Sequence, residues 1–157
     1  MGVVAASLAC FTSDVPLDAT PALDVDPALL GTWRCLPSSA DSGDVATIEV
    51  TRKTDRVYAI TFRSPGEDPD RYEAHASSVN GTTLLNVREL EKTNQSWVFA
   101  RYEFLRPSVL EVQLVSDTLL KGAEGPAPVL RQALEKHQAN PSLYSDFCVC
   151  VRAKARM

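Results

Sequence analysis

The chain lacks the residue patterns that mark several large classes of protein. Among its 157 residues there is no apolar run of the roughly 20 residues that a transmembrane helix needs. The patterns G-x-S-x-G, H-E-x-x-H and G-x-G-x-x-G and the phosphate-binding loop are absent, and the only histidines are His75 and His137. We therefore expect no enzyme activity, and we assign no catalytic residue, no metal ligand and no cofactor.

Positive charge is scarce at the start of the chain. The first basic residue is Arg34, and the only charged side chains before it are Asp14, Asp18, Asp24 and Asp26. This leader carries the whole net charge of −4, because acidic and basic residues are equal in number after it. Nucleic-acid binding depends on clustered lysine and arginine. We therefore expect no nucleic-acid partner.

The first ten residues, MGVVAASLAC, are apolar and uncharged, and small residues lead up to Cys10. The stretch from Ser7 to Cys10 resembles the lipobox of bacterial lipoproteins. The resemblance implies that residues 1–10 are a lipoprotein signal-like segment and that a lipid anchor on Cys10 holds the protein to a membrane. Phe11, rather than aspartate, follows Cys10, which by the same resemblance implies an outer-membrane lipoprotein of the cell envelope that faces the periplasm. If the segment is not a signal, the expectation is a cytoplasmic protein with a frayed terminus.

The next stretch, residues 11–27, reads FTSDVPLDATPALDVDP. It holds three prolines and four aspartates, and it has neither helical nor strand periodicity. Such a composition buries too little apolar surface to offset the entropy lost on ordering. The sequence therefore predicts a flexible acidic tether here.

From Gly31 onward, apolar and polar residues alternate as they do in half-buried strands. In VYAITFR, for example, Tyr58, Ile60 and Phe62 share one face. Turn residues separate the segments, and Asn80-Gly81 is the most specific, because a type I′ hairpin turn needs positive φ at both positions. Seven further segments continue the alternation: GTWRC, TIEVTRK, RYEAHAS, TTLLNVREL, SWVFARYEF, VLEVQLVS and DFCVCVRAK.

One segment has helical periodicity instead. In PAPVLRQALEKHQANP the apolar residues follow helical spacing, with prolines at the start and beyond the end, which predicts a helix near Val129–Gln138. The fold class is therefore mainly β. We expect residues 28–157 to form a closed barrel, an eight-stranded antiparallel meander with one helix before the last strand, since closure removes unpaired sheet edges.

Closure would place the first and last strands side by side, and three of the four cysteines lie on them. Cys35 is on the first strand, and Cys148 and Cys150 share one face of the last. In an exported protein we expect a disulfide from Cys35 to Cys148, or alternatively to Cys150. The alternatives are three inert buried thiols, or a soft metal site for which the sequence offers no fourth ligand.

The triplet Gly31-Thr32-Trp33 resembles the G-x-W signature with which lipocalins and other calycins begin. This resemblance spans Asp26 to Lys154 as a pattern of strands. With GTWRC near its start and cysteines in its last strand, the body also resembles uncharacterised small bacterial lipoproteins. The lipocalin resemblance implies that a short turn before Gly31 plugs one end of the barrel and that Trp33 packs beneath an arginine near the end of the chain. Arg152 occupies that place, and we expect Gly31, Trp33 and Arg152 to have structural roles.

Ligand binding is the expected function class. Aromatic residues on the presumed inward faces would either line a pocket for a small, mostly apolar ligand or fill a narrow barrel. The expected protein is thus a membrane-tethered, lipocalin-like binding protein of the bacterial envelope. The residues assigned to the pocket are Trp33, Tyr58, Phe62, Tyr72 and Tyr102.

The alternative function is a non-enzymatic module for protein–protein interaction or structure in the envelope. The segment SWVFARYEF is apolar on both faces, so Trp97 and Phe99 point away from the predicted interior. An exposed aromatic patch would fit an envelope protein partner. We expect the helix to cover both residues, because its own apolar face also requires burial.

Overall fold

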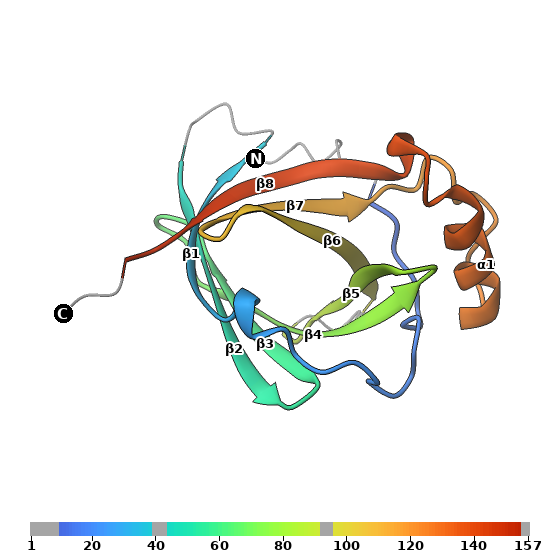
Figure 1. Ribbon diagram of the computed structural model, residues 1–157, viewed down its shortest axis with the longest axis horizontal. Helices are drawn as coiled ribbons and strands as arrows, with labels where there is room; N and C mark the ends of the chain where they lie inside the picture. The colour runs from blue at the N-terminus through green and yellow to red at the C-terminus, as the bar shows by residue number, and fades with distance from the viewer. Residues whose placement is uncertain (1–9, 39–43, 92–95, 155–157) are drawn as a thin grey trace.

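The computed structural model describes residues 10–38, 44–91 and 96–154 (Figure 1). Within these ranges the elements follow the predicted order, and the helix α1 (Ala127–His137) lies between the last two strands. Two short 3-10 turns, η2 (Pro27–Leu29) and η3 (Pro141–Leu143), precede the first and the last strand. The strands are β1 (Gly31–Pro37), β2 (Ala46–Thr54), β3 (Val57–Arg63), β4 (Asp70–Val79), β5 (Thr82–Glu89), β6 (Trp97–Arg106), β7 (Val109–Val115) and β8 (Tyr144–Arg152).

The strands form a closed antiparallel barrel, which confirms the predicted fold class. Each strand pairs with the next along the chain, and β8 pairs with β1 to complete the ring (Figure 1). At this seam Trp33 lies opposite Arg152, and Cys35 lies opposite Cys150. The closure leaves no unpaired strand edge in the sheet.

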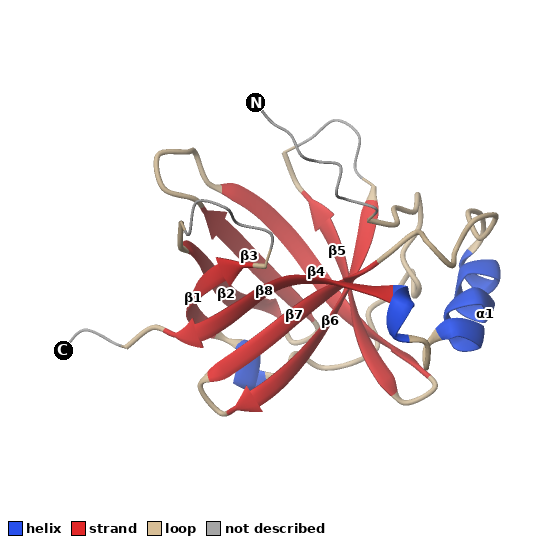
Figure 2. Ribbon diagram, turned by 90° about the horizontal axis from the view of Figure 1, so that it is seen from above, coloured by secondary structure: helices blue, strands red, loops and turns tan. Residues whose placement is uncertain are grey.

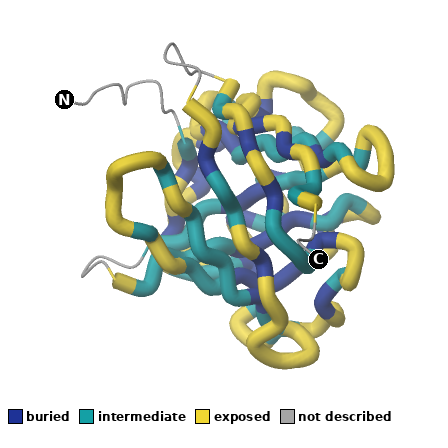
Figure 3. Tube along the Cα trace, turned by 90° about the vertical axis from the view of Figure 1, so that its left-hand side faces the viewer, coloured by how far each residue is buried: buried dark blue, intermediate teal, exposed yellow. Residues whose placement is uncertain are grey.

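Alternation along the strands divides the side chains between the barrel interior and its outer face. On β1, Trp33 and Cys35 are buried while Arg34 and Leu36 are exposed. On β8 the buried residues Cys148 and Cys150 alternate with exposed ones in the same way. In Figure 3 the exposed residues gather mainly at the loops that join the strands.

A second apolar cluster lies outside the barrel wall. β5 and β6 carry apolar residues on both faces. Leu84 and Phe99 lie on the outer face, yet their side chains are only 2% and 0% exposed. The helix covers this face through Leu130 and Leu134, both fully buried, and it lies outside the ring of strands in Figures 1 and 2. The predicted cover over Phe99 is therefore confirmed, whereas Trp97 is only half-buried.

The first described residues correct the prediction of a flexible tether over residues 11–27. Residues 10–26, which we name the strap, run along the barrel wall as part of the fold (Figure 1). Its apolar residues Phe11, Leu17 and Val25 are 3%, 3% and 4% exposed. The cover for the outer face of β5 and β6 is therefore made by the strap and α1 together.

Hydrogen bonds hold the strap in place. Ser13 exchanges two backbone hydrogen bonds with Trp97, and the Leu17 amide donates to Asn86 Oδ1 at 2.7 Å. The Asn86 amide group donates in turn to Ser77 Oγ, so a buried polar side chain on the wall is satisfied by the strap. The carboxylate of Asp18 accepts a hydrogen bond from the guanidinium of Arg131, so the strap is also tied to α1.

Local turn chemistry explains two further features. Asn80 and Gly81 have φ of 48° and 83°, which confirms the predicted type I′ geometry between β4 and β5. The helix begins two residues earlier than predicted and carries proline in its first turn, where a missing amide costs little. Arg131 donates to the carbonyl of Ser78 as well as to Asp18, so α1 is tied to the end of this hairpin.

Candidate functional site

The interior of the barrel holds a cavity of about 590 Å³. Ligand pockets in proteins measure roughly 300–1,000 Å³, so the volume suits one small molecule. The walls come from all eight strands, and most lining side chains are aliphatic or aromatic. The residues that line it include Leu29, Trp33, Ile48, Val50, Tyr58, Ile60, Phe62, Asp70, Tyr72, Leu85, Val87, Glu89, Val98, Ala100, Tyr102, Leu110, Val112, Leu114 and Phe147.

All five aromatic residues assigned to the pocket from the sequence lie on the cavity wall. Trp33, Tyr58 and Tyr102 lie toward the end that η2 covers, and Phe62 and Tyr72 lie toward the opposite end. They do not fill the barrel, because the cavity remains between them. The alternation of residues thus predicted correctly that these rings face inward. The volume of the cavity could not be predicted from the sequence.

One end of the cavity is closed by η2 and the start of β1. The indole Nε1 of Trp33 donates to the Leu29 carbonyl at 2.9 Å, and Leu29 is buried at the cavity floor. The Arg152 guanidinium lies 4.2 Å from the Trp33 ring centre and donates to the carbonyls of Ala28 and Leu30. The predicted contact between Trp33 and Arg152 is therefore present, and it locks η2 over the barrel end.

Glycine is required at position 31 by both backbone and space. Gly31 has a φ of 133°, a region that other residues rarely adopt, and a Cβ there would lie 2.8 Å from Nη1 of Arg152. A larger residue would push the guanidinium off the Trp33 ring. Gly31 thus leaves the space in which the Arg152 guanidinium packs on the Trp33 ring.

The closed end also holds a polar group that the sequence prediction missed. Tyr102 Oη donates to Asp26 Oδ2 at 3.1 Å, and the Asp26 amide donates to Tyr58 Oη at 2.8 Å. Burial raises the pKa of both tyrosines, and the Asp26 charge raises that of Tyr102 further. Both hydroxyls therefore stay neutral at physiological pH. Because Asp26 fell in the predicted tether, its role could not be found from composition.

The opposite end opens to solvent and carries two carboxylates. Asp70 is exposed and pairs with Phe62, and the half-buried Glu89 pairs with Tyr72. Burial raises the pKa of Tyr72 to about 12, and the charges of Glu89 and Asp70 add to the effect. The sequence did contain a signal for both acids. Asp70 is two residues from the inward-facing Tyr72 and Glu89 is two residues from the inward-facing Val87, so alternation places both acids on the inner face.

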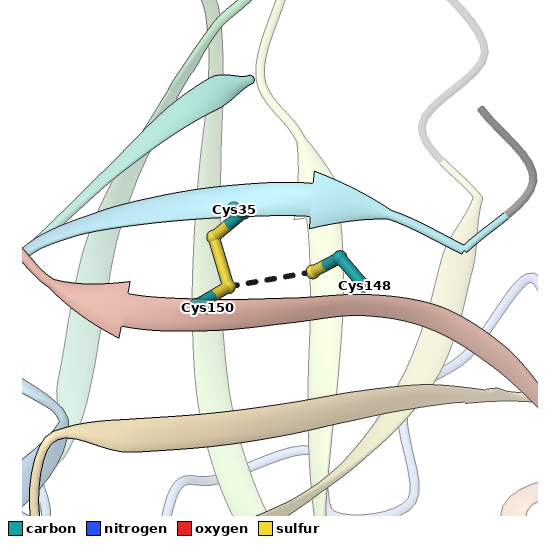
Figure 4. Close-up of side chains that lie close together, drawn as sticks. All are labelled: Cys35, Cys148 and Cys150. Carbon is teal, nitrogen blue, oxygen red and sulfur yellow. Dashed lines mark hydrogen bonds between the residues drawn. A yellow bond between two sulfur atoms is a disulfide. The ribbon is translucent and has the colours of Figure 1, made fainter. Parts of the chain in front are cut away.

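The barrel seam is closed by a disulfide, Cys35–Cys150 (Figure 4). The pairing corrects the preference for Cys148 and agrees with the alternative. The register explains the choice, because Cys35 lies opposite Cys150 whereas Cys148 lies opposite Pro37. Cys148 stays a free buried thiol, its Sγ 3.5 Å from the Cys150 Sγ.

The three sulfur atoms lie within 4.8 Å of one another, which is close enough for a shared soft metal ion. Two of them are joined in the disulfide, so Cys148 alone offers a thiol. Burial raises the pKa of that thiol to about 12, and the thiolate is the form that binds metals and attacks disulfides. In the disulfide form the cluster therefore acts as a structural seam.

Cys10, the predicted site of lipid attachment, lies at the cavity's open end. It forms a β-bridge with Ser116 just beyond β7, and its half-buried side chain contributes to the cavity lining. Burial raises the pKa of its thiol, and the Asp117 charge adds to the effect. The rest of the signal-like segment, residues 1–9, lies outside the described residues.

The histidines have structural surroundings. His75 is 5% exposed, its Nε2 lies 2.8 Å from the Asp18 carbonyl oxygen, and its ring meets Trp97 edge-on. Because Asp18 belongs to the strap, this contact shows that the strap covers the His75 side chain. His137 ends α1 and is half-buried. The guanidinium of Arg88 lies 4.9 Å from the ring centre of Trp97, so the indole is partly covered.

None of the helices within the described residues has the length and apolar character needed to span a bilayer. Comparisons of the chain with protein-family models, curated proteins and solved structures give no match.

Proposed function

We propose that this protein is a carrier for a small, mostly apolar ligand, which it holds inside the barrel. The observation that carries the proposal is the apolar cavity of about 590 Å³, closed by η2 at one end and open at the other. No catalytic residue is assigned, since the proposed function is binding.

The energetics of the cavity support an occupant. Wall residues around an empty apolar space lack dispersion partners on one side, and water gains few hydrogen bonds from aliphatic walls. A ligand of matching size would restore those contacts and release poorly bound water. The closed end is fixed by Arg152 and Trp33, so the site is formed before a ligand enters.

We further propose that Cys10 carries a lipid anchor and that the protein resides in the bacterial envelope, at the outer membrane and facing the periplasm. The support is the SLAC sequence, together with a seam disulfide of the kind that exported proteins retain. Because the strap packs against the wall from Phe11 onward, an anchor at Cys10 would hold the cavity mouth close to the membrane surface.

Binding of a neutral dye tests the carrier function. A naphthylamine dye whose fluorescence rises in apolar surroundings should bind the full chain at one site per molecule. Ala100 lies on the cavity wall between Leu85 and Leu114, so Ala100→Phe should weaken dye binding at least about tenfold by occupying the space.

The matched control is Ala59→Phe on β3. Ala59 lies between the inward-facing Tyr58 and Ile60, so its side chain points to the outer face. Dye affinity should be unchanged in this variant. Equal affinity in all three proteins, each shown to be folded by circular dichroism, would contradict a binding site in the barrel.

A second candidate function, an envelope interaction module, draws on a different surface from the expected one. On the outer face of the seam, Leu36, Val149 and Val151 are 50%, 40% and 49% exposed, and Leu36 lies opposite Val149. Exposed apolar neighbours of this kind fit a protein contact. A photoreactive residue at position 36 should then give one defined crosslinked product in the envelope, and none when placed at exposed Glu49.

A further inference from the structure

Three buried cysteines meet at the barrel seam. Cys35 comes from β1, Cys148 and Cys150 come from β8, and each is 1% exposed (Figure 4). Their sulfur atoms lie within 4.8 Å of one another, and the Sγ atoms of Cys148 and Cys150 are 3.5 Å apart. The bridge between Cys35 and Cys150 uses two of these sulfurs. Cys148 adds a third sulfur in the same place, which a structural disulfide does not require.

The spacing of the sulfurs suits a small metal ion. An ion that is bound by three thiolates, at about 2.3 Å from each, has those sulfurs about 4 Å apart. The sulfurs of Cys148 and Cys150 are already close to that spacing. The Cα atoms of Cys35 and Cys150 are 4.0 Å apart, so reduction of their bond leaves room for these two sulfurs to reach the same spacing through side-chain rotation.

The surroundings favour a soft cation that needs few ligands. Among the residues that the structure describes, no histidine, aspartate or glutamate joins this group of three sulfurs. The pairing partners of the two β8 cysteines are Val112 and Leu110 on β7, so apolar residues flank the cluster. Structural Zn²⁺ sites have four ligands. Thiolates also select Cu⁺, which is stable with three.

The cavity gives a reductant access to the cluster, because Cys150 is one of its lining residues. A small dithiol that enters from the open end can attack Sγ of Cys150, form a mixed disulfide there and release Cys35 as a thiol. The second thiol of the reagent then displaces Cys150. The dithiol leaves as a cyclic disulfide, and two electrons and two protons have passed to the cysteines.

We propose that the reduced seam is a binding site for one Cu⁺ ion, held by the sulfurs of Cys35, Cys148 and Cys150. Each Cu–S bond forms as the thiol concerned releases its proton to solvent. The positive ion offsets the charge of the thiolates, which would otherwise be costly in an apolar interior. The inference goes beyond the carrier function and does not depend on it, because the site lies in the barrel wall.

Uptake of Cu⁺ from a competing chelator tests the site. The full chain is reduced with dithiothreitol under argon, freed of the reductant and mixed with the coloured Cu⁺ complex of bicinchoninate. We expect the reduced chain to take up one Cu⁺ per molecule. The unreduced chain, which keeps its bridge, should take up none at the same chelator concentration.

The two cysteines outside the bridge provide a matched pair of variants. Cys148→Ser removes the third sulfur of the site and should lower the Cu⁺ affinity of the reduced chain at least about tenfold. Cys10→Ser removes the remaining cysteine of the chain, which does not belong to the sulfur cluster, and should leave the affinity unchanged.

Unfolding measurements distinguish a folded site from thiols of a disordered chain. A ligand that binds the folded state stabilises it. One equivalent of Cu⁺ should therefore raise the urea midpoint of the reduced chain, or restore its circular dichroism spectrum where reduction alone unfolds it. Equal affinity in Cys148→Ser and the native sequence, weaker binding in Cys10→Ser, or Cu⁺ uptake with no gain in stability would overturn the inference.

Discussion

At the scale of single residues, the tyrosines of the cavity combine apolar surroundings with neutral hydroxyls. Tyr72 lies on the wall beside Glu89 and Asp70, and Tyr102 donates to Asp26. Burial is the main reason that the pKa of each is raised, and the neighbouring carboxylates act in the same direction. In both cases the folded protein favours the protonated hydroxyl.

A loss of stability in alkaline solution follows from the raised pKa of Tyr72. The pKa is about 12 in the folded chain, against 10.0 for an ordinary tyrosine. The stabilisation is complete below pH 10, where the hydroxyl is neutral in both states, and it is lost as pH rises from 10 towards 12 because the unfolded chain ionises first. Urea unfolding should show a smaller alkaline loss for Tyr72→Phe than for the native sequence. Identical losses would show that Tyr72 does not contribute.

At the scale of elements, the strap is the segment whose structure differs most from what its composition predicts. It has the prolines and aspartates of a disordered chain, yet the side chains of Phe11, Leu17 and Val25 are among the most buried in the molecule. Phe11 and Leu17 complete the cover over the outer face of β5 and β6, which α1 supplies only in part. The strap therefore belongs to the folded domain.

Two leucines of the strap provide a matched test of this assignment. Leu17 is 3% exposed and Leu23 is 37% exposed. Leu17→Ala should lower the free energy of unfolding by about 2–5 kcal/mol, as for other buried leucines. Leu23→Ala should change it by less than about 0.5 kcal/mol. Equal effects in urea titrations would mean that the strap does not pack as described.

The barrel could be predicted from the sequence because its signal is local. Alternation, turn residues and the G-x-W triplet each lie within a few neighbouring positions, and they correctly gave the strand order, the helix and the inward faces. The strap could not be predicted, because its burial depends on distant partners such as Asn86 and Trp97. One signal was present, since β5 and β6 are apolar on both faces and required a cover.

The finer features of the site depended on register, which alternation does not specify. Whether Cys35 meets Cys148 or Cys150 is a shift of two residues, and both cysteines share a face. Glu89 lies opposite Tyr72, two residues from Asp70, only through the pairing of β5 with β4. The cavity volume depends on how all the inward side chains pack, which no short stretch of sequence reports.

At the scale of the whole molecule, the seam disulfide joins strands that are 115 residues apart in sequence. A crosslink over so long a loop restricts the unfolded chain strongly. Replacing Cys35 and Cys150 with alanine should lower the free energy of unfolding by about 2–5 kcal/mol. Cys148→Ala retains the bridge and should cause a clearly smaller loss. Similar losses in the two variants would mean that the bridge does not stabilise the barrel.

The carrier function is tested most directly by the stoichiometry of binding. Native mass spectrometry of the full chain, mixed with the neutral naphthylamine dye in modest excess, reports how many dye molecules each chain retains. We expect one bound ligand per chain in the native sequence and in Ala59→Phe, and a strongly reduced fraction bound in Ala100→Phe. No retained ligand, or equal retention of several ligands in all three proteins, would contradict a single site inside the barrel.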